Sequence, residues 1–190
     1  MWFCANYKEN NNYLGGIPIK KHTIYEGKVI DLGIETARLP TGGDCKLEII
    51  RHPGGAVALA LNSANEVCLL RQYRYATGGW LWELPGGRLE PGESALESAQ
   101  RELLEEAGLE AGAWQVLTEI WSTPGFCDEK LYLFLARELK NVEPCTEEDE
   151  VIEVHWLPLA EAIRMCDNND ITDAKTMVGL YRLQREMPGV

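Results

Sequence analysis

Apolar and polar residues alternate in short segments near the start of the chain. Residues 23–30, 32–39 and 46–51 each follow a strand-like alternation, and Gly or Pro residues separate them. We therefore predict a three-stranded antiparallel sheet. A sheet this small is marginally stable alone in water, so it is expected to pack on the rest of the protein or on a second chain.

Longer apolar runs follow this region. Residues 56–62 and 66–73, on either side of a turn at 62–65, are apolar through most of their length and predict a pair of strands covered on both faces. The remaining periodic segments predict four strands (80–85, 114–121, 130–137 and 151–157) and two helices (158–166 and 173–187). This order favours an α/β fold with a mixed sheet between helices.

The domain organisation follows from where the periodicity begins. Residues 1–20 lack periodicity and contain runs of Asn and Gly, so they are expected to form a flexible arm. Residues 21–52 hold the N-terminal antiparallel sheet, and residues 53–190 the larger domain.

One further helix is predicted from the end of a tight turn at Pro91-Gly92. Ser94 and Glu97 have the spacing of a capping box, and Gly108 provides a stop signal. Four apolar residues share one stripe and four charged residues the opposite arc: Leu96, Ala99, Leu103 and Ala107 against Arg101, Glu102, Glu105 and Glu106. We expect the apolar stripe to face the core.

The three carboxylates on this helix repel one another unless a cation lies between them. Oxygen ligands without clustered His or Cys favour Mg²⁺, or Mn²⁺, over Zn²⁺. The alternative interpretation is a solvated acidic helix face, which is the usual meaning of a charge run.

Composition restricts the partners and the compartment. The chain has 190 residues, 45% of them apolar, and a net charge of −12, which disfavours nucleic acid and anionic membranes as partners. An anionic substrate would then need metal ions and a few well-placed arginines. Six scattered cysteines and the absence of a long apolar run predict a cytoplasmic protein with reduced thiols.

The stretch from Gly87 to Leu109 matches the Nudix box at every constrained position: Gly, five residues, Glu, seven residues, then Arg-Glu-aliphatic-x-Glu-Glu-x-Gly-aliphatic. The chain therefore resembles Nudix hydrolases. This resemblance implies metal binding by Glu102, Glu105, Glu106 and the backbone carbonyl of Gly86. It also implies that Glu93 and Arg101 form an ion pair that holds the loop on the helix.

Segments outside the box resemble the ADP-ribose pyrophosphatase branch of that family. They are residues 51–58, 70–75, 82–87, 122–126 with 128–129, and 172–176. The resemblance covers roughly residues 24 to 186. It implies an α/β/α sandwich and a homodimer in which the N-terminal sheet is exchanged between subunits and helps to build the substrate site.

The activity implied is metal-dependent hydrolysis of a nucleoside diphosphate linked to another group, with ADP-ribose cut to AMP and ribose 5-phosphate. By the same resemblance, Glu150 is expected to orient the attacking water, with Glu148 and Glu105 as alternatives. The candidate substrate contacts are Arg74, Arg51 and Arg71, whose guanidinium groups suit phosphate oxygens, together with Glu83 and Tyr25. Trp80 and Trp82 are expected in the core.

Two alternative functions remain open at this level. One is hydrolysis of GDP-mannose or another nucleotide sugar, because no motif specifies the base. The other is a catalytically silent Nudix module that senses a nucleotide.

Overall fold

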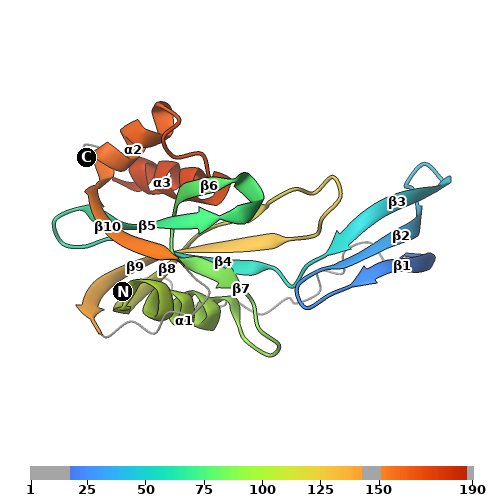
Figure 1. Cartoon of the computed structure of the whole chain (residues 1–190), viewed down its shortest axis with the longest axis horizontal. Helices are drawn as coiled ribbons and strands as arrows, with labels where there is room; N and C mark the ends of the chain where they lie inside the picture. The colour runs from blue at the N-terminus through green and yellow to red at the C-terminus, as the bar shows by residue number, and fades with distance from the viewer. Residues whose placement is uncertain (1–17, 143–150, 188–190) are drawn as a thin grey trace. The chain divides into compact units, whose positions relative to one another are not determined.

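The computed structural model describes residues 18–142 and 151–187, and the chain divides into two compact units (Figure 1). One unit contains Met1–His52 together with Gly125–Asp128, and the other contains Pro53–Pro124 and Glu129–Val190. Most of the expected N-terminal arm, residues 1–17, lies outside the described residues.

The N-terminal unit is built on the predicted three-stranded antiparallel sheet. Its strands are β1 (Lys20–Glu26), β2 (Asp31–Arg38) and β3 (Asp44–Arg51), in the order β1-β2-β3. The first strand ends earlier than the predicted residue 30. The chain turns there, because the Gly27 amide donates a hydrogen bond to the Ile30 carbonyl at 2.9 Å.

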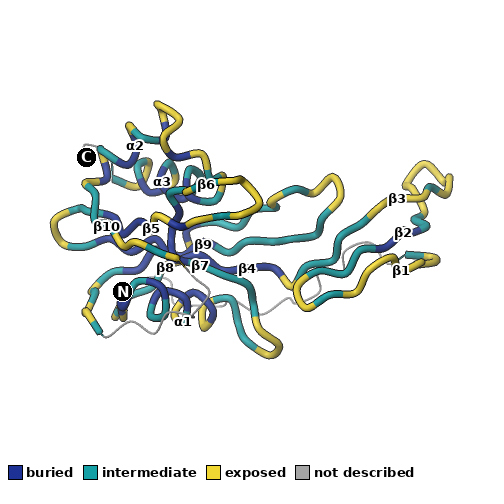
Figure 2. Tube along the Cα trace, in the orientation of Figure 1, coloured by how far each residue is buried: buried dark blue, intermediate teal, exposed yellow. Residues whose placement is uncertain are grey.

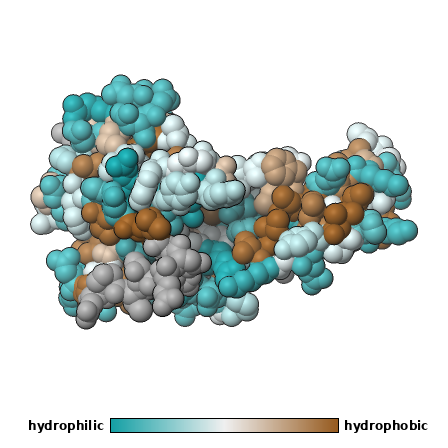
Figure 3. Space-filling view, viewed as in Figure 1, coloured by the Kyte–Doolittle hydropathy of each residue, from teal (hydrophilic) through white to brown (hydrophobic). Residues whose placement is uncertain are grey.

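The sheet leaves a group of large apolar side chains exposed to solvent. Every residue of β1 is exposed. Figure 3 shows apolar side chains in the region of this sheet; in the described part of the unit the large exposed ones are Ile19, Ile24, Tyr25, Val29, Leu39, Leu47 and Phe126. Exposed apolar side chains gathered on one small sheet are typical of a surface that a partner covers.

The larger unit contains two sheets where a single mixed sheet was predicted. The first has the order β10-β5-β6 and the second β7-β4-β9-β8. The strands are β4 (Gly55–Ala60), β5 (Glu66–Arg74), β6 (Gly79–Glu83), β7 (Gly86–Arg88), β8 (Leu109–Trp121), β9 (Lys130–Asn141) and β10 (Ile152–Pro158). Only the second sheet is mixed, because β4 runs parallel to β9 and all other pairs are antiparallel.

The strands β4 and β5 do not form the hairpin that the apolar runs suggested. They belong to different sheets, and an isolated bridge between Leu61 and Val67 is the pairing between the two runs. β4 is nevertheless buried at all six positions, as predicted for a strand covered on both faces (Figure 2).

Alternate residues of β4 and β9 contribute to two hydrophobic cores. Val57, Leu59, Leu133 and Leu135 belong to the core that also holds residues of α2 (Leu159–Asp167) and α3 (Ala174–Glu186). The opposite face presents small residues, Ala56, Ala58, Ala60 and Ala136 among them, to the core that holds Ala99 and Leu103 of α1 (Ala95–Ala107). Helices thus cover both faces, and the small side chains allow α1 to approach the sheet closely.

The local signals at α1 are confirmed. Ser94 caps the helix in a reciprocal capping box with Glu97, and Gly108 ends it in the left-handed conformation at φ 63°. The predicted core stripe is wrong at Leu96, which is 36% exposed. Glu102 and Glu106 are instead buried beside Ala99 and Leu103, so part of the acidic face lies against the sheet.

None of the helices in the described parts of the chain is long and apolar enough to cross a membrane.

Candidate active site

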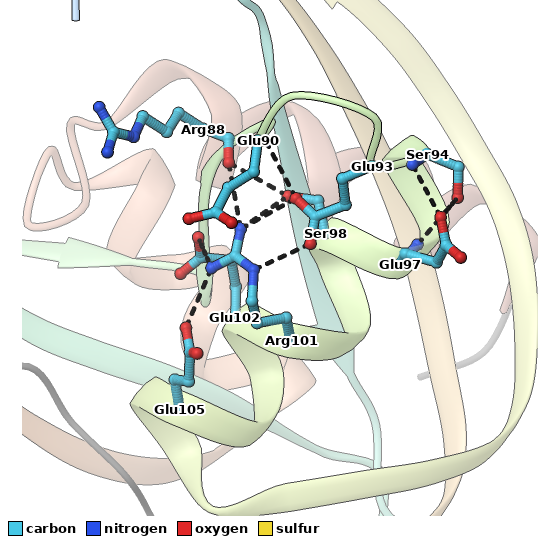
Figure 4. Close-up of polar contacts among 9 residues, drawn as sticks. All are labelled: Arg88, Glu90, Glu93, Ser94, Glu97, Ser98, Arg101, Glu102 and Glu105. Carbon is cyan, nitrogen blue, oxygen red and sulfur yellow. Dashed lines mark hydrogen bonds and ion pairs between the residues drawn. The ribbon is translucent and has the colours of Figure 1, made fainter. Parts of the chain in front are cut away.

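Arg101 holds the acidic face of α1 together (Figure 4). Its Nε and Nη2 donate to Glu93 at 2.9 and 3.1 Å, which is the ion pair implied by the resemblance. Its Nη1 donates to Glu102 at 2.7 Å and to Glu105 at 3.0 Å. The hydrogen bond with Glu93, together with these further carboxylate contacts, raises the pKa of Arg101, so the guanidinium stays charged. One cation therefore offsets the repulsion among three carboxylates.

Glu106 and Glu102 lie against the strand that precedes the helix. Glu106 is 3% exposed and accepts a hydrogen bond from the Gly86 amide at 2.7 Å. A Cβ on Gly87 would lie 2.2 Å from Glu102 Oε1, and a Cβ on Gly86 would lie 2.5 Å from the Ala56 carbonyl oxygen. Glycine at both positions thus lets β7 fit between β4 and the carboxylates of α1.

The donor set here suits a hard divalent cation. Glu102 and Glu106 offer carboxylate oxygens at the β7–α1 junction, and hard divalent cations prefer oxygen ligands. Within residues 18–142 and 151–187, no three acidic, His or Cys side chains converge as a metal-holding group. Arg101 engages Glu102 and Glu105, and the Gly86 amide engages Glu106.

Glu83, at the end of β6, is a buried carboxylate between two cations. It is 2% exposed and accepts hydrogen bonds from Arg74 Nε at 2.7 Å and Arg74 Nη2 at 2.9 Å. Lys175 forms an ion pair with the same carboxylate. Burial alone would raise the pKa of Glu83, but the hydrogen bond from Arg74 and the charge of Lys175 outweigh it and lower the pKa to about 2. Arg74 and Glu83, both candidate substrate contacts, are thus brought together.

Arg71 lies on the other face of β5 from Arg74. The uninterrupted pairing of β5 with β6 places Arg71 opposite Trp82 and Arg74 opposite Gly79, and side chains alternate along a strand. The Arg71 guanidinium lies 5.7 Å from the Trp80 ring centre and 5.9 Å from that of Trp82. The expectation that Trp80 is in the core is wrong, since it is 41% exposed, whereas Trp82 packs against the core in part.

Arg51 is engaged within the N-terminal unit. Its Nε donates to Glu35 at 2.9 Å and its Nη1 to Asp128 at 3.0 Å, and Glu35 is 3% exposed. The hydrogen bond with Glu35 and the contact with Asp128 raise the pKa of Arg51. The His52 amide also donates to Asp128, at 2.8 Å. These contacts fasten residues 125–128 to the end of β3.

The remaining candidates include residues that the structure does not describe. Tyr25 is 58% exposed on β1. Glu150 and Glu148 lie outside the described residues.

Three participants in these charge clusters had no role assigned from the sequence: Glu35, Asp128 and Lys175. Their partners are 16, 77 and 92 residues away. Sequence spacing carries no signal of such pairs. Asp128 and Lys175 do lie in segments that resemble the ADP-ribose branch.

Comparison with known proteins adds an independent observation. The NUDIX domain model matches residues 51–178. The ADP-ribose pyrophosphatase of Bacillus subtilis is 38% identical over 168 residues, covering 87% of this chain and 91% of that protein. The GDP-mannose pyrophosphatase of Escherichia coli O139:H28 is 34% identical over 154 residues, covering 72% of this chain and 80% of that protein.

The fold is shared with a solved structure described as an ADP compounds hydrolase. The TM-score is 0.77 at 21% sequence identity, and the match covers 91% of this chain and 94% of that chain. Since the domain match extends over most of the chain and includes β7 and α1 with their acidic side chains, the protein belongs to the NUDIX family.

Proposed function

We propose that this protein hydrolyses ADP-ribose to AMP and ribose 5-phosphate. The observation that carries the proposal is the 38% identity with an ADP-ribose pyrophosphatase along nearly the whole length of both chains. The complete set of box carboxylates, held by Arg101 and by the Gly86 amide, supports turnover over a silent sensing role.

Glu102, Glu105, Glu106 and the Gly86 carbonyl are the proposed ligands of Mg²⁺, with Mn²⁺ as an alternative. A bound divalent cation would neutralise charge on the diphosphate oxygens during attack by water. Glu102 and Glu105 each accept from Arg101 Nη1 through one carboxylate oxygen, and an ionised carboxylate has further lone pairs with which it can coordinate a cation. Arg101 is also held by Glu93 through Nε and Nη2.

Arg74 is the best-supported diphosphate contact. Two of its nitrogens are used by Glu83, and within the described ranges its Nη1 makes no hydrogen bond. The side chain of Arg74 is 42% exposed, so a ligand can reach it. The hydrogen bond with Glu83 raises the pKa of Arg74, and the charge of Glu106 adds to this rise, so Arg74 stays charged.

The other assignments stay as proposals from the sequence. Arg51 and Arg71 are proposed further diphosphate or ribose contacts, Tyr25 a base-stacking residue, and Glu150 the residue that orients water. For Arg51 and Arg71 to serve, their contacts with Glu35 and with the Trp80 ring must be exchanged or shared.

The second candidate function is hydrolysis of GDP-mannose. The relative from Escherichia coli that carries this name is 34% identical to the chain. Both reactions split a nucleoside diphosphate bond, so the same carboxylates would serve. Discrimination between ADP-ribose and GDP-mannose depends on contacts with the base. Each polar group there that is left without a hydrogen bond costs about 1–3 kcal/mol of binding free energy.

We further propose a cytoplasmic homodimer. The exposed apolar side chains of the N-terminal sheet support a second copy as the partner. Within the described residues, the thiols of Cys45, Cys68 and Cys166 form no disulfide, in keeping with a reducing compartment.

A substrate panel tests the activity. Products from ADP-ribose, GDP-mannose, ADP-glucose and diadenosine polyphosphates are identified by chromatography with saturating Mg²⁺, and kcat/KM is compared. ADP-ribose is expected to give the highest value. A tenfold advantage for any other compound would overturn the ADP-ribose assignment, and absence of products from all of them would favour a sensing module.

The Glu106→Gln variant tests the proposed metal site. It keeps an acceptor for the Gly86 amide but removes a charge, so kcat should fall at least about 100-fold with an unchanged circular dichroism spectrum. Turnover within about tenfold of wild type would exclude Glu106 as a metal ligand.

A further inference from the structure

The N-terminus of α3 positions Lys175 to form its ion pair with Glu83. Asp173 caps this helix by accepting from the Thr176 amide at 3.0 Å, and Lys175 Nζ lies 3.0 Å from Asp173 Oδ1. The Thr176 hydroxyl in turn accepts a hydrogen bond from the Leu84 amide at 2.8 Å. The first turn of α3 is therefore fastened to the residue that follows Glu83, and Lys175 has little freedom to move elsewhere.

The Glu83 carboxylate divides its two oxygens between the two cations. Oε1 accepts from Arg74 Nε, while Oε2 is shared by Arg74 Nη2 and Lys175 Nζ. Because both oxygens are held, the carboxylate plane is fixed, and a bidentate pair transfers that plane to the guanidinium group. Lys175 can therefore influence the orientation of the remaining edge of Arg74 through the Glu83 carboxylate that both cations share.

The exposures of the two cations separate their roles. The side chain of Lys175 is 15% exposed, whereas that of Arg74 is 42% exposed. Lys175 is thus largely enclosed, and it forms ion pairs with two carboxylates of the protein, those of Glu83 and Asp173. Arg74 is the member of the cluster that a diphosphate can reach.

We propose that Lys175 is a positioning residue for substrate binding, acting through Glu83 to orient Arg74 toward the diphosphate. This inference rests on the proposed function, since it assigns Arg74 to the substrate of that site. The competing explanation is that Lys175 only anchors α3 to the end of β6 and stabilises the fold.

A double-mutant cycle between Lys175 and Arg74 distinguishes the two explanations. Lys175→Met should raise KM about tenfold and change kcat by less than about threefold, because it loosens a contact that holds the substrate in both the ground and transition states. Lys175→Arg, which keeps the charge, should bring KM back to within about threefold of wild type. In an Arg74→Ala background, Lys175→Met should change KM by less than about twofold, because the residue it acts through is gone.

The matched control is Arg185→Met, which removes one positive charge from an exposed position of the same helix. It should leave KM unchanged. If Lys175→Met is too unstable to purify, Lys175→Gln takes its place in the cycle. Thermal unfolding of each variant shows how much of any effect reflects stability.

The inference is overturned if Lys175→Met lowers the melting temperature but leaves KM at the wild-type value. It is also overturned if the effects on KM of Lys175→Met and Arg74→Ala multiply in the double variant. The cycle is run with the best substrate of the panel, whichever nucleoside diphosphate compound that is. Failure of the ADP-ribose assignment is therefore seen on the wild-type protein and leaves the test of Lys175 intact.

Discussion

Glu83 keeps its negative charge in a buried position because two cations surround it. Arg74, Lys175 and the neighbouring Asp173 are the charged groups of this cluster. Leaving an isolated carboxylate in such a place would be costly, and removing one partner of a buried pair is more damaging than never having built it. The cluster contributes to stability as well as to the site.

The lowered pKa of Glu83 predicts a dependence of stability on pH. The folded-state pKa is about 2 against an ordinary value of 4.5, so the contribution is present above pH 4.5 and is lost as the pH falls toward 2. Between pH 5 and pH 3 the free energy of unfolding should fall by about 2 kcal/mol from this group. Urea unfolding of wild type and Glu83→Gln at both pH values gives the difference. Equal pH dependence in the two proteins would show that Glu83 titrates normally in the folded state.

At the scale of elements, β7 is packed so closely between β4 and α1 that its adjacent glycines, Gly86 and Gly87, have no room for a side chain. The atoms that fill this space differ between the two positions. An added Cβ would meet the backbone of β4 at Gly86, but the end of the Glu102 side chain at Gly87. Backbone cannot move aside easily, whereas a side chain can turn away. We therefore expect substitution by Ala to affect mainly stability at Gly86 and mainly metal binding at Gly87.

Gly86→Ala should lower the free energy of unfolding by about 1–3 kcal/mol through overpacking. Gly87→Ala should cost less than about 1 kcal/mol in stability but weaken Mn²⁺ binding about tenfold or more, because Glu102 is displaced. Urea unfolding and calorimetric titration with Mn²⁺ measure the two effects. Wild-type Mn²⁺ affinity in Gly87→Ala would argue against Glu102 as a ligand, and wild-type stability in Gly86→Ala would contradict the close approach to β4.

At the scale of the whole molecule, the N-terminal sheet predicts self-association. Ile24 and Leu47 are 53% and 41% exposed, and we expect a homodimer in which residues 22–51 of one chain cover the site of the other. Sedimentation velocity should give a dimer for wild type, and Ile24→Glu with Leu47→Glu should shift it toward monomer. Val116→Glu, which alters an equally exposed apolar residue of β8, is the control and should remain dimeric. A fully active 21.3 kDa wild-type monomer would remove the prediction.

The sequence by itself determined those features that depend on neighbours in the chain. The cap at Ser94, the stop at Gly108 and the antiparallel N-terminal sheet all have partners within a few residues or a short turn. Local hydrogen bonding and side-chain periodicity decide such features, so they can be read before folding. The Nudix box is likewise one continuous segment, which is why the family was evident from it.

Tertiary structure alone decided which distant residues form ion pairs and which face of an element is buried. Apolar periodicity says that β4 and β5 are buried, but not that they join different sheets. Helical periodicity placed Leu96 in the core, yet close packing against β7 buries Glu102 and Glu106 instead. Lys175 reaches Glu83 across 92 residues of sequence, because α3 begins where β6 ends. Pairings of this kind arise only when separate elements pack, so no local pattern specifies them.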